Sequence, residues 1–275
     1  MTDLPALVAT DLDGTFLSPD GTVSALNARA VAAARDAGIQ VVFATGRPPT
    51  WMGPITDLGM TPTPVIACNG ALRYDASSGE ILDCRDLPAD VVETIAAGIA
   101  PIVPHATIGI QWPDAFGAQP GYFTDPPGGG YLVDTVPALL GRAGPILKVL
   151  VQTYGTGLDD LVTTLHSIAG DAVSLTWSTP GSAPGERVLI EVGAAGVDKA
   201  AMLARHCAEL GITADGVAAF GDMPNDHGML AWAGRPYVMT PCHPLLHDLG
   251  ARQAGSNAED AVGRTILSWL QAPRP

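Results

Sequence analysis

The sequence predicts an α/β fold: a doubly wound, Rossmann-like parallel sheet that carries a second α/β domain as an insertion. Short apolar runs alternate with helical patterns at both ends of the chain, and this alternation lapses between residues 85 and 186. Runs that are apolar throughout are typical of parallel strands covered by helices on both faces. We therefore expect a core domain formed by residues 1–84 and 187–275, interrupted by an inserted domain at residues 85–186.

The first core segment follows a strand–helix–strand order. Apolar runs that end at turn residues predict its strands. An Ala-rich stretch that stops at Gly38 predicts its first helix, because glycine commonly follows the last helical turn. Pro48 suits the first position of a further helix, since its φ angle is already helical. The expected strands span residues 6–10, 40–44 and 64–68, and the expected helices span residues 24–37 and 48–58.

The same alternation returns in the second core segment, whereas the insertion differs in composition. In the insertion, half of residues 113–130 are Gly or Pro, and the apolar runs are isolated from one another. This change in pattern indicates a separate domain. In the second core segment we expect strands at residues 188–192, 216–220 and 236–239, and helices at residues 198–210, 224–231 and 258–270.

The composition indicates a folded protein and argues against two classes of partner. The 275 residues are 47% hydrophobic and 15% charged, which disfavours a disordered chain. Acidic residues outnumber Lys and Arg, 28 against 14, for a formal net charge of −14. Nucleic acids and anionic membranes attract clustered basic residues, so we expect neither as a partner. A small anionic substrate remains compatible, because a metal ion and a few cations reverse the sign locally.

Cysteine usage and the chain start indicate a cytoplasmic protein. The four cysteines form no C-x-x-C pair, which predicts reduced thiols. The first residues lack the basic flank and apolar stretch of a signal peptide. No apolar run approaches the length of a membrane span.

The first chemical motif, Asp11-Leu12-Asp13-Gly14-Thr15, directly follows a buried strand. Side chains at positions i and i+2 of a strand share a face, so Asp11 and Asp13 are expected to point together. Two adjacent carboxylates need a cation or a shared proton. An ordinary strand-end turn also contains Asp and Gly and would explain D-x-D alone. The full D-L-D-G-T pattern after an apolar strand favours a functional site.

Two further positions offer groups that bind anions. In Thr45-Gly46-Arg47, a hydroxyl, a glycine N–H and a helix start at Pro48 would form an anion-binding corner. The alternative is an ordinary helix cap with a solvated Arg. Lys199 lies in a mostly apolar helical turn. A lone Lys is ordinarily solvated, but apolar neighbours favour an inward-facing cation that requires an anion.

The last motif, Gly221-Asp222-Met223-Pro224-Asn225-Asp226, again follows a strand. Pro224 suits the first position of a helix, and Asp222 suits its N-cap. The spacing i, i+3, i+4 brings the polar side chains of 222, 225 and 226 together. Hard oxygen ligands from Asp222 and Asp11 suit Mg²⁺, which binds few carboxylates and keeps several waters. Helix capping alone would explain Asp222 but not the Asn-Asp pair.

Taken together, these four motifs resemble those of the haloacid dehalogenase-like (HAD) hydrolase superfamily. Asn69-Gly70-Ala71 after the third strand, and the insertion after the second motif, are similar to the Cof-type phosphatase branch. Cys68 stands where that branch often has Ser. The resemblance covers most of the expected core domain and almost none of the insertion. It implies a HAD-like catalytic core with an α/β cap that selects the substrate.

The resemblance also implies a role for each motif residue. Asp11 would attack phosphorus, and Asp13 would protonate the leaving oxygen and later deprotonate the attacking water. Phosphate would be held by Thr45, Gly46, Lys199 and Asn225, with Arg47 and Asn69 as further substrate contacts. Mg²⁺ would be held by Asp11, the Asp13 backbone carbonyl and Asp222, supported by Asp226. In the cap, candidate substrate contacts are Trp112, Phe116, Tyr122 and Phe123, which could equally pack the cap's own core.

The expected function is therefore Mg²⁺-dependent hydrolysis of a small phosphorylated metabolite, such as a sugar phosphate, through an aspartyl-phosphate. A carboxylate with an ordinary pKa of about 3.9 is already ionised near neutral pH, so Asp11 would need no base. Two alternatives remain open. A phosphosugar mutase would return the phosphoryl group to another hydroxyl, and a non-catalytic module would only bind phosphorylated metabolites.

Overall fold

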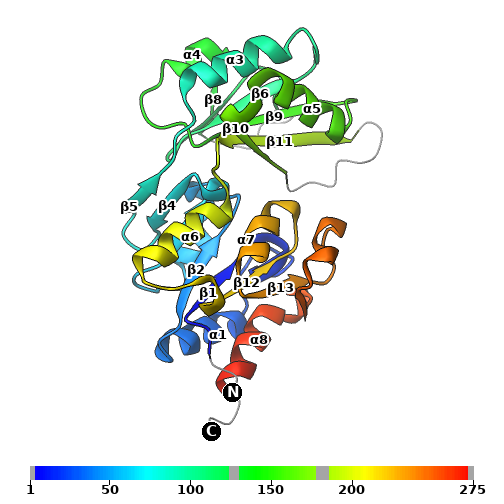
Figure 1. The fold of residues 1–275 in the computed structure, drawn as a ribbon. Coiled ribbons are helices and arrows are strands. Elements are labelled where there is room, and N and C mark those ends of the chain that lie inside the picture. The colour runs from blue at the N-terminus through cyan, green and yellow to red at the C-terminus, as the bar shows by residue number, and fades with distance from the viewer. Residues whose placement is uncertain (1–3, 124–129, 178–185, 272–275) are drawn as a thin grey trace. The chain divides into compact units, whose positions relative to one another are not determined.

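The computed structural model describes residues 4–123, 130–177 and 186–271 and divides the chain into two compact units (Figure 1). The larger unit comprises Met1–Arg47, Trp51–Asp83 and Asp198–Pro275. The smaller unit comprises Cys84–Val197 together with Pro48–Thr50. The smaller unit is therefore almost entirely one insertion into the larger one.

The larger unit is built on an eight-stranded sheet in the order β14-β13-β12-β1-β2-β3-β4-β5. Strands β14 to β3 of that order run parallel, and β4 pairs antiparallel with β3. This confirms the expected parallel α/β core. The strands are β1 (Leu7–Thr10), β2 (Gln40–Ala44), β3 (Pro64–Ala67), β4 (Leu72–Asp75), β5 (Ile81–Cys84), β12 (Val217–Gly221), β13 (Arg235–Met239) and β14 (Arg252–Gly255).

Helices cover both faces of this sheet, which explains why its central strands are apolar throughout. Alternate strand residues such as Leu7 and Ala9 pack with the α6 and α7 side chains Met202 and Met229. On the opposite face, the ring of Phe220 contacts that of Trp269 in α8, which packs beside α1. The helices are α1 (Ala25–Asp36), α2 (Gly53–Thr56), α6 (Lys199–Glu209), α7 (His227–Trp232) and α8 (Ala261–Gln271).

The smaller unit has a six-stranded sheet in the order β10-β11-β9-β6-β7-β8. Its pairs are antiparallel except for β7 with β8. The helices pack on one sheet face over a core that includes Ile108, Ile110, Val149 and Val151. The elements are β6 (Thr107–Gln111), β7 (Phe116–Ala118), β8 (Leu132–Val133), β9 (Lys148–Tyr154), β10 (Val173–Thr176), β11 (Arg187–Ala194), α3 (Ala89–Ile99), α4 (Val136–Leu140) and α5 (Leu158–Ala169).

The second domain boundary differs from the expectation at residue 187. Strand β11 lies between β9 and β10 in the smaller sheet, and the larger unit resumes only at Asp198. Val188, Ile190 and Val192 pack into the smaller unit's core, and Glu191 points to the other face. This alternation is typical of an antiparallel strand with one covered face. The expectation of a core strand was therefore wrong.

The helix expected over residues 48–58 is also absent. The segment forms a 3₁₀ turn, Pro49–Trp51, and the single helical turn α2. Pro49 and Pro54 lack N–H groups, so a continuous helix would lose hydrogen bonds there. The Gly/Pro-rich stretch 113–130 contains β7, and its residues 124–129 lie outside the described part. Among the described residues, no helix is both long and apolar enough to cross a membrane.

Candidate active site

The polar motifs lie at the carboxyl ends of three neighbouring parallel strands. Thr10 at the end of β1 is level with Phe43 of β2 and Phe220 of β12. Asp11, Thr45 and Asp222 follow these strands, so they emerge along one edge of the sheet. This edge is where open parallel sheets bind ligands, at the point where the strand order reverses.

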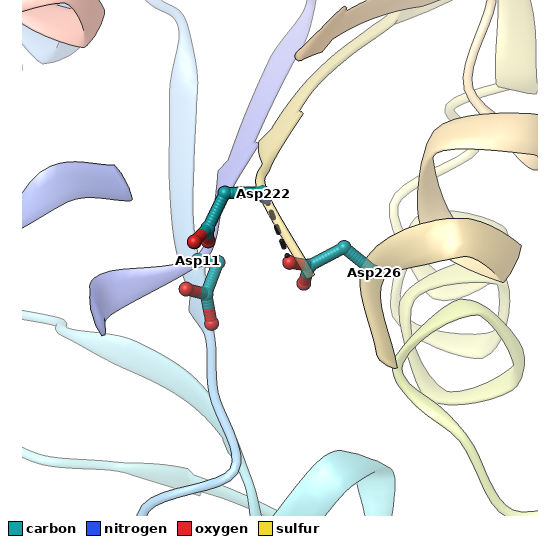
Figure 2. Close-up of side chains that lie close together, drawn as sticks. All are labelled: Asp11, Asp222 and Asp226. Carbon is teal, nitrogen blue, oxygen red and sulfur yellow. Dashed lines mark hydrogen bonds between the residues drawn. The ribbon is translucent and has the colours of Figure 1, made fainter. Parts of the chain in front are cut away.

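Three carboxylates gather at this edge. Asp11, Asp222 and Asp226 each place a carboxylate oxygen within 4.8 Å of the others. Figure 2 shows Asp11 and Asp222 side by side, with Asp226 reaching across to the Asp222 backbone. Asp11 and Asp226 are buried, and Asp222 is half-buried. Such a cluster of like charges is unstable in a low-dielectric environment unless cations balance it.

Lys199 supplies one of those cations. Its ammonium donates to Asp11 Oδ1 and to Asp226 Oδ1, both at 2.6 Å, and its side chain is 0% exposed. Lys199 is the first residue of α6, whose N-cap is Asp198, with Oδ1 accepting from the Ala201 N–H at 2.6 Å. The expectation of an inward-facing Lys that requires an anion is confirmed.

Without a bound metal ion, the electrostatics of the cluster favour protonation of the carboxyl groups of Asp11 and Asp222. Burial raises the pKa of Asp11 well above its ordinary value, and Asp226 and Asp222 raise it further against the opposing effect of Lys199. Burial and the neighbouring Asp226 raise the pKa of Asp222 to about 7. Burial lowers the pKa of Lys199, but Asp11 and Asp226 outweigh it and raise that pKa above its usual range. Lys199 is therefore charged.

The donor set fits a divalent cation. Three carboxylates against one ammonium leave a formal charge of −2 when all are ionised. Hard oxygen ligands in small number are typical of Mg²⁺ sites. The raised pKa values of Asp11 and Asp222 show that this charge is incompletely balanced by the protein alone. Asp11 and Asp222 could hold such an ion.

Asp226 positions Lys199 and the loop that carries Asp222 through hydrogen bonds. Its Oδ1 accepts from Lys199, and its Oδ2 accepts from the backbone N–H groups of Asp222 (3.0 Å) and Met223 (3.1 Å). Both carboxylate oxygens of Asp226 therefore accept hydrogen bonds from donors within the protein. Asp222 was expected to cap the helix that follows, but Met223 occupies the N-cap position and Asp226 accepts the loop N–H groups instead. Asp222 is thereby left to face Asp11.

Asp13 is not one of the three clustered carboxylates, and whereas Asp11 pairs with Lys199, Asp13 pairs with Arg47. Strand β1 ends at Thr10, so the alternation of a strand does not extend to Asp13. The Asp13 side chain is 60% exposed and paired with Arg47, whose Nε and Nη2 donate at 2.7 and 2.5 Å. Arg47 therefore orients Asp13 through a two-point contact, which is geometrically specific.

Two further residues of the first motif, Thr15 and Gly14, contact Asp222. Thr15 Oγ1 donates to Asp222 Oδ1 at 3.0 Å and so orients that carboxylate. Gly14 has φ +74°, and a Cβ there would lie 2.3 Å from Asp222 Oδ2. Only glycine permits this close approach of the two motifs. The pattern D-L-D-G-T contained both residues, but nothing in the sequence indicated their contact with Asp222.

The remaining polar residues of the site are Thr45, Asn69 and Asn225. The buried Thr45 Oγ1 accepts from the Arg47 N–H at 3.1 Å. Asn225 Nδ2 donates to Asn69 Oδ1 at 3.0 Å, and Gly46 lies beside the same oxygen. The structure thus brings Asn225 to Asn69, whereas the Lys199 ammonium contacts Asp11 and Asp226.

The raised pKa of Asp222 predicts a pH-dependent metal affinity. Below about pH 7 the carboxyl holds a proton that Mg²⁺ must displace, so affinity is expected to weaken up to about tenfold per pH unit as pH falls. Isothermal titration with Mg²⁺ in two buffers of different ionisation enthalpy would report both the affinity and the released proton. Asp222→Asn should lose the affinity. An affinity that stays constant between about pH 6 and pH 8 would contradict the prediction.

Comparison with known proteins agrees with this geometry. The sequence model of the haloacid dehalogenase-like hydrolases matches residues 8–101 and 141–266. An HMP-PP phosphatase of Escherichia coli O157:H7 (strain EC4115) is 28% identical, over 97% of this chain and 96% of its own. The pyridoxal phosphate phosphatase of Escherichia coli K12 is 26% identical, over 96% of this chain and 98% of its own.

Solved structures resemble the whole fold. A haloacid dehalogenase-like hydrolase from Bacteroides thetaiotaomicron superimposes with a TM-score of 0.76 at 23% identity, over 96% of this chain and 99% of its own. A sugar phosphatase of HAD subclass IIB superimposes with a TM-score of 0.78 at 16% identity, over 96% of this chain and 98% of its own. At these identities the likeness concerns the fold.

Proposed function

The chain belongs to the haloacid dehalogenase-like hydrolase family and is a phosphatase of that family, and we propose that it hydrolyses small phosphate monoesters through an aspartyl-phosphate on Asp11 with Mg²⁺ as cofactor. The observation that carries the proposal is the buried contact between Asp11 and Lys199 at the carboxyl end of β1, beside Asp222. It combines a nucleophile, a fixed cation and a second carboxylate for a metal ion.

In the first half-reaction, a carboxylate oxygen of Asp11 attacks phosphorus and the bond from phosphorus to the ester oxygen breaks. The raised pKa of Asp11 means that the ordinary-pKa argument for its ionisation does not hold in the protein without metal. Bound Mg²⁺ would supply the positive charge that keeps Asp11 and Asp222 ionised and offsets the charge of the phosphoryl group. Lys199 adds a second fixed positive charge at the nucleophile.

Asp13 would transfer the protons. It protonates the departing ester oxygen in the first half-reaction. In the second half-reaction, Asp13 accepts a proton from the water that attacks phosphorus. The bond between phosphorus and the Asp11 oxygen breaks, which releases inorganic phosphate and restores the Asp11 carboxylate. The exposure of Asp13 supports this role, because leaving group and water both need access to it. Arg47 would orient Asp13 and serve as a substrate contact.

Thr45, Gly46, Asn225 and Lys199 would hold the transferring group. Each lies at the same sheet edge as Asp11, and the oxygens of a phosphoryl group accept hydrogen bonds from hydroxyl, amide and ammonium donors. Positioning and charge stabilisation are the main demands of phosphoryl transfer, so a set of fixed donors suits this reaction.

We propose that the smaller unit, Cys84–Val197, acts as a cap that selects the substrate. All four phosphate motifs lie in the larger unit, which leaves the smaller unit without an assigned chemical role. Small phosphorylated metabolites, such as sugar phosphates or pyridoxal phosphate, are the proposed substrate class. The names of the relatives support this class, since one relative is a pyridoxal phosphate phosphatase and a structural neighbour is a sugar phosphatase.

The aromatic residues of the smaller unit divide into two groups. Trp112 is 0% exposed in the helix-covered core, so its expected contact with substrate is wrong. Phe116, Tyr122 and Phe123 pack ring to ring, and two of them lie over Gly109, on the sheet face away from the helices. Tyr131 joins them through Phe123. This aromatic cluster on the sheet face opposite the helices is the proposed place for substrate selection.

Phe123→Ala is therefore expected to change the ratio of kcat/KM for pyridoxal phosphate to that for a hexose phosphate by about tenfold. Turnover of p-nitrophenyl phosphate should persist, because the catalytic groups lie in the other unit. Trp112→Phe is the matched control and should lower Tm without changing the ratio. An unchanged ratio in Phe123→Ala, or an equal loss on every substrate, would contradict the selection role.

A phosphate-release screen with Mg²⁺ tests the proposed function. The panel contains hexose phosphates, pyridoxal phosphate, HMP-PP and p-nitrophenyl phosphate, with Asp11→Asn as the inactive control. Release of inorganic phosphate by the wild type alone is expected. Recovery of an isomeric hexose phosphate in place of free sugar would indicate a mutase. Binding of esters without any release would indicate a non-catalytic module.

A further inference from the structure

Three consecutive residues between β3 and β4 have positive φ angles. These are Cys68 (φ 50°), Asn69 (φ 53°) and Gly70 (φ 100°), which form the turn Cys68–Gly70. Side chains of L-residues disfavour this region, although Asn tolerates it better than most. A run that includes Cys and Asn persists only where surrounding contacts hold it, and such strain concentrates at functional sites.

The first set of contacts joins this turn to the second motif. The Cys68 N–H donates to the Arg47 carbonyl at 3.1 Å, and the Asn69 N–H donates to the Thr45 carbonyl at 3.0 Å. A Cβ on Gly46 would lie 3.2 Å from Asn69 Oδ1. The turn therefore fixes both ends of Thr45-Gly46-Arg47, and the missing side chain at Gly46 leaves room for the Asn69 amide.

The second contact joins the turn to the last motif. Asn225 Nδ2 donates to Asn69 Oδ1 at 3.0 Å, although 156 positions separate the two residues in the chain. The opposite end of the Asn225 amide, Oδ1, is shielded from solvent and meets no hydrogen-bond partner. A shielded acceptor without a partner is costly and points to a donor such as water that completes it. The bond to Asn69 fixes the orientation of the Asn225 amide and uses one N–H of Nδ2, so the second N–H is the donor left for an oxyanion.

The third contact joins the turn to the start of α6. A Cβ on Gly70 would lie 2.1 Å from the Asp198 carbonyl oxygen and 2.5 Å from its carbon. Backbone atoms cannot move aside as a flexible side chain can. The turn therefore packs directly on the residue that precedes Lys199, whose ammonium contacts Asp11.

We propose that the turn Cys68–Gly70 is a positioning element that sets Thr45, Asn225 and Lys199 relative to one another for binding a phosphoryl oxyanion, with Asn69 and Gly70 as its positioning residues. Asn69 acts through Asn225 and the Thr45 loop, and Gly70 acts through the backbone of Asp198. The inference rests on the proposed function for the identity of the anion. It extends that function because it replaces the expected direct substrate contact of Asn69 with an indirect role.

Two variants test the contribution of the Asn69 side chain separately from that of the Gly70 backbone contact. Asn69→Gly keeps a residue that adopts positive φ and removes only the amide. Gly70→Ala adds the Cβ that meets Asp198. Gly79→Ala is the matched control, because Gly79 also has positive φ (76°) but no atom lies within 4 Å of its added Cβ. The control thus carries the same kind of backbone strain without the contact.

The readouts are titration with tungstate in the presence of Mg²⁺, titration with Mg²⁺ alone, and Tm. Tungstate affinity should fall about tenfold in Asn69→Gly, the effect of one hydrogen bond, and about 10²-fold in Gly70→Ala, where Lys199 is displaced. Mg²⁺ affinity should be unchanged in Asn69→Gly and in the control, since neither substitution alters a carboxylate of the cluster. A merely structural role would lower Tm and leave tungstate affinity intact.

Tungstate affinity at the wild-type level in folded Asn69→Gly would overturn the proposal, even if Gly70→Ala failed to fold. A wild-type protein that binds no tungstate would overturn it as well. Absence of turnover on every ester, with the tungstate pattern intact, would instead overturn the proposed function and leave the positioning role supported.

Discussion

Asp11→Asn is expected to reduce turnover by about 10³-fold or more while the protein still binds phosphate esters. A carboxamide oxygen is a poor nucleophile and cannot form the acyl-phosphate. The substitution keeps the shape of the side chain, and it removes one negative charge that repels an anionic ester. It also relieves the buried cluster, because the pKa of Asp11 is raised by burial and by its carboxylate neighbours. Tm should therefore not fall.

Steady-state kinetics on p-nitrophenyl phosphate and tungstate titration would check this expectation together. Asp57→Asn serves as the control, since Asp57 is exposed and lies outside the carboxylate cluster. Turnover of Asp11→Asn within about tenfold of the wild type would rule out Asp11 as the nucleophile.

Lys199→Met is expected to lower both the turnover and the free energy of unfolding. Removing one partner of a buried ion pair leaves uncompensated charge, which destabilises a fold by about 3–5 kcal/mol. Here two buried carboxylates, Asp11 and Asp226, lose the same ammonium. Turnover should fall by about 10²-fold or more, since a fixed positive charge at the transferring group is lost.

The stability loss in Lys199→Met should depend on pH. Lys199 lowers the pKa of Asp11 and of Asp222, so its removal raises both values further above those of the unfolded chain. The folded state then binds more protons than the unfolded state, and stability falls as pH rises. The Tm deficit should therefore grow as pH rises through about 7, the pKa of Asp222 with Lys199 present, toward about pH 8 in chelator.

The double variant Lys199→Met/Asp226→Asn isolates the charge effect. It removes one negative charge together with the ammonium, so Tm should recover most of the deficit while turnover stays low. A deficit of equal size at acid and alkaline pH, or one that the double variant does not reduce, would contradict the electrostatic account of this ion pair.

Much of the fold and the position of the site could be predicted from the sequence. The strands β1, β2, β12 and β13 are largely apolar, and three of the four motifs follow directly on a strand end. Parallel strands bring those ends to one edge, so separations along the chain did not obscure the site. Lys199 was recognisable because its apolar neighbours have no reason to surround an exposed cation.

The rest depends on three-dimensional contacts that local patterns do not carry. Asp13 pairs with Arg47 from the second motif, 34 positions along the chain, and no local pattern indicates that contact. The approach of Gly14 to Asp222 and the bond from Asn225 to Asn69 join distant segments. Strand β11 resembled a core strand because Val188, Ile190 and Val192 are apolar in either sheet. Its antiparallel neighbours, not its composition, place it in the smaller unit.

The central claim is that the phosphoryl group passes through a covalent bond to Asp11, and acid quenching during turnover tests it most directly. The wild type, mixed with Mg²⁺ and an ester that it hydrolyses, is quenched, treated with borohydride and mapped by mass spectrometry. An acyl-phosphate is reduced by borohydride to an alcohol, so the account predicts that the Asp11 side chain alone is converted. Rapid phosphate release with an unmodified Asp11, or with the modification on another residue, would contradict it.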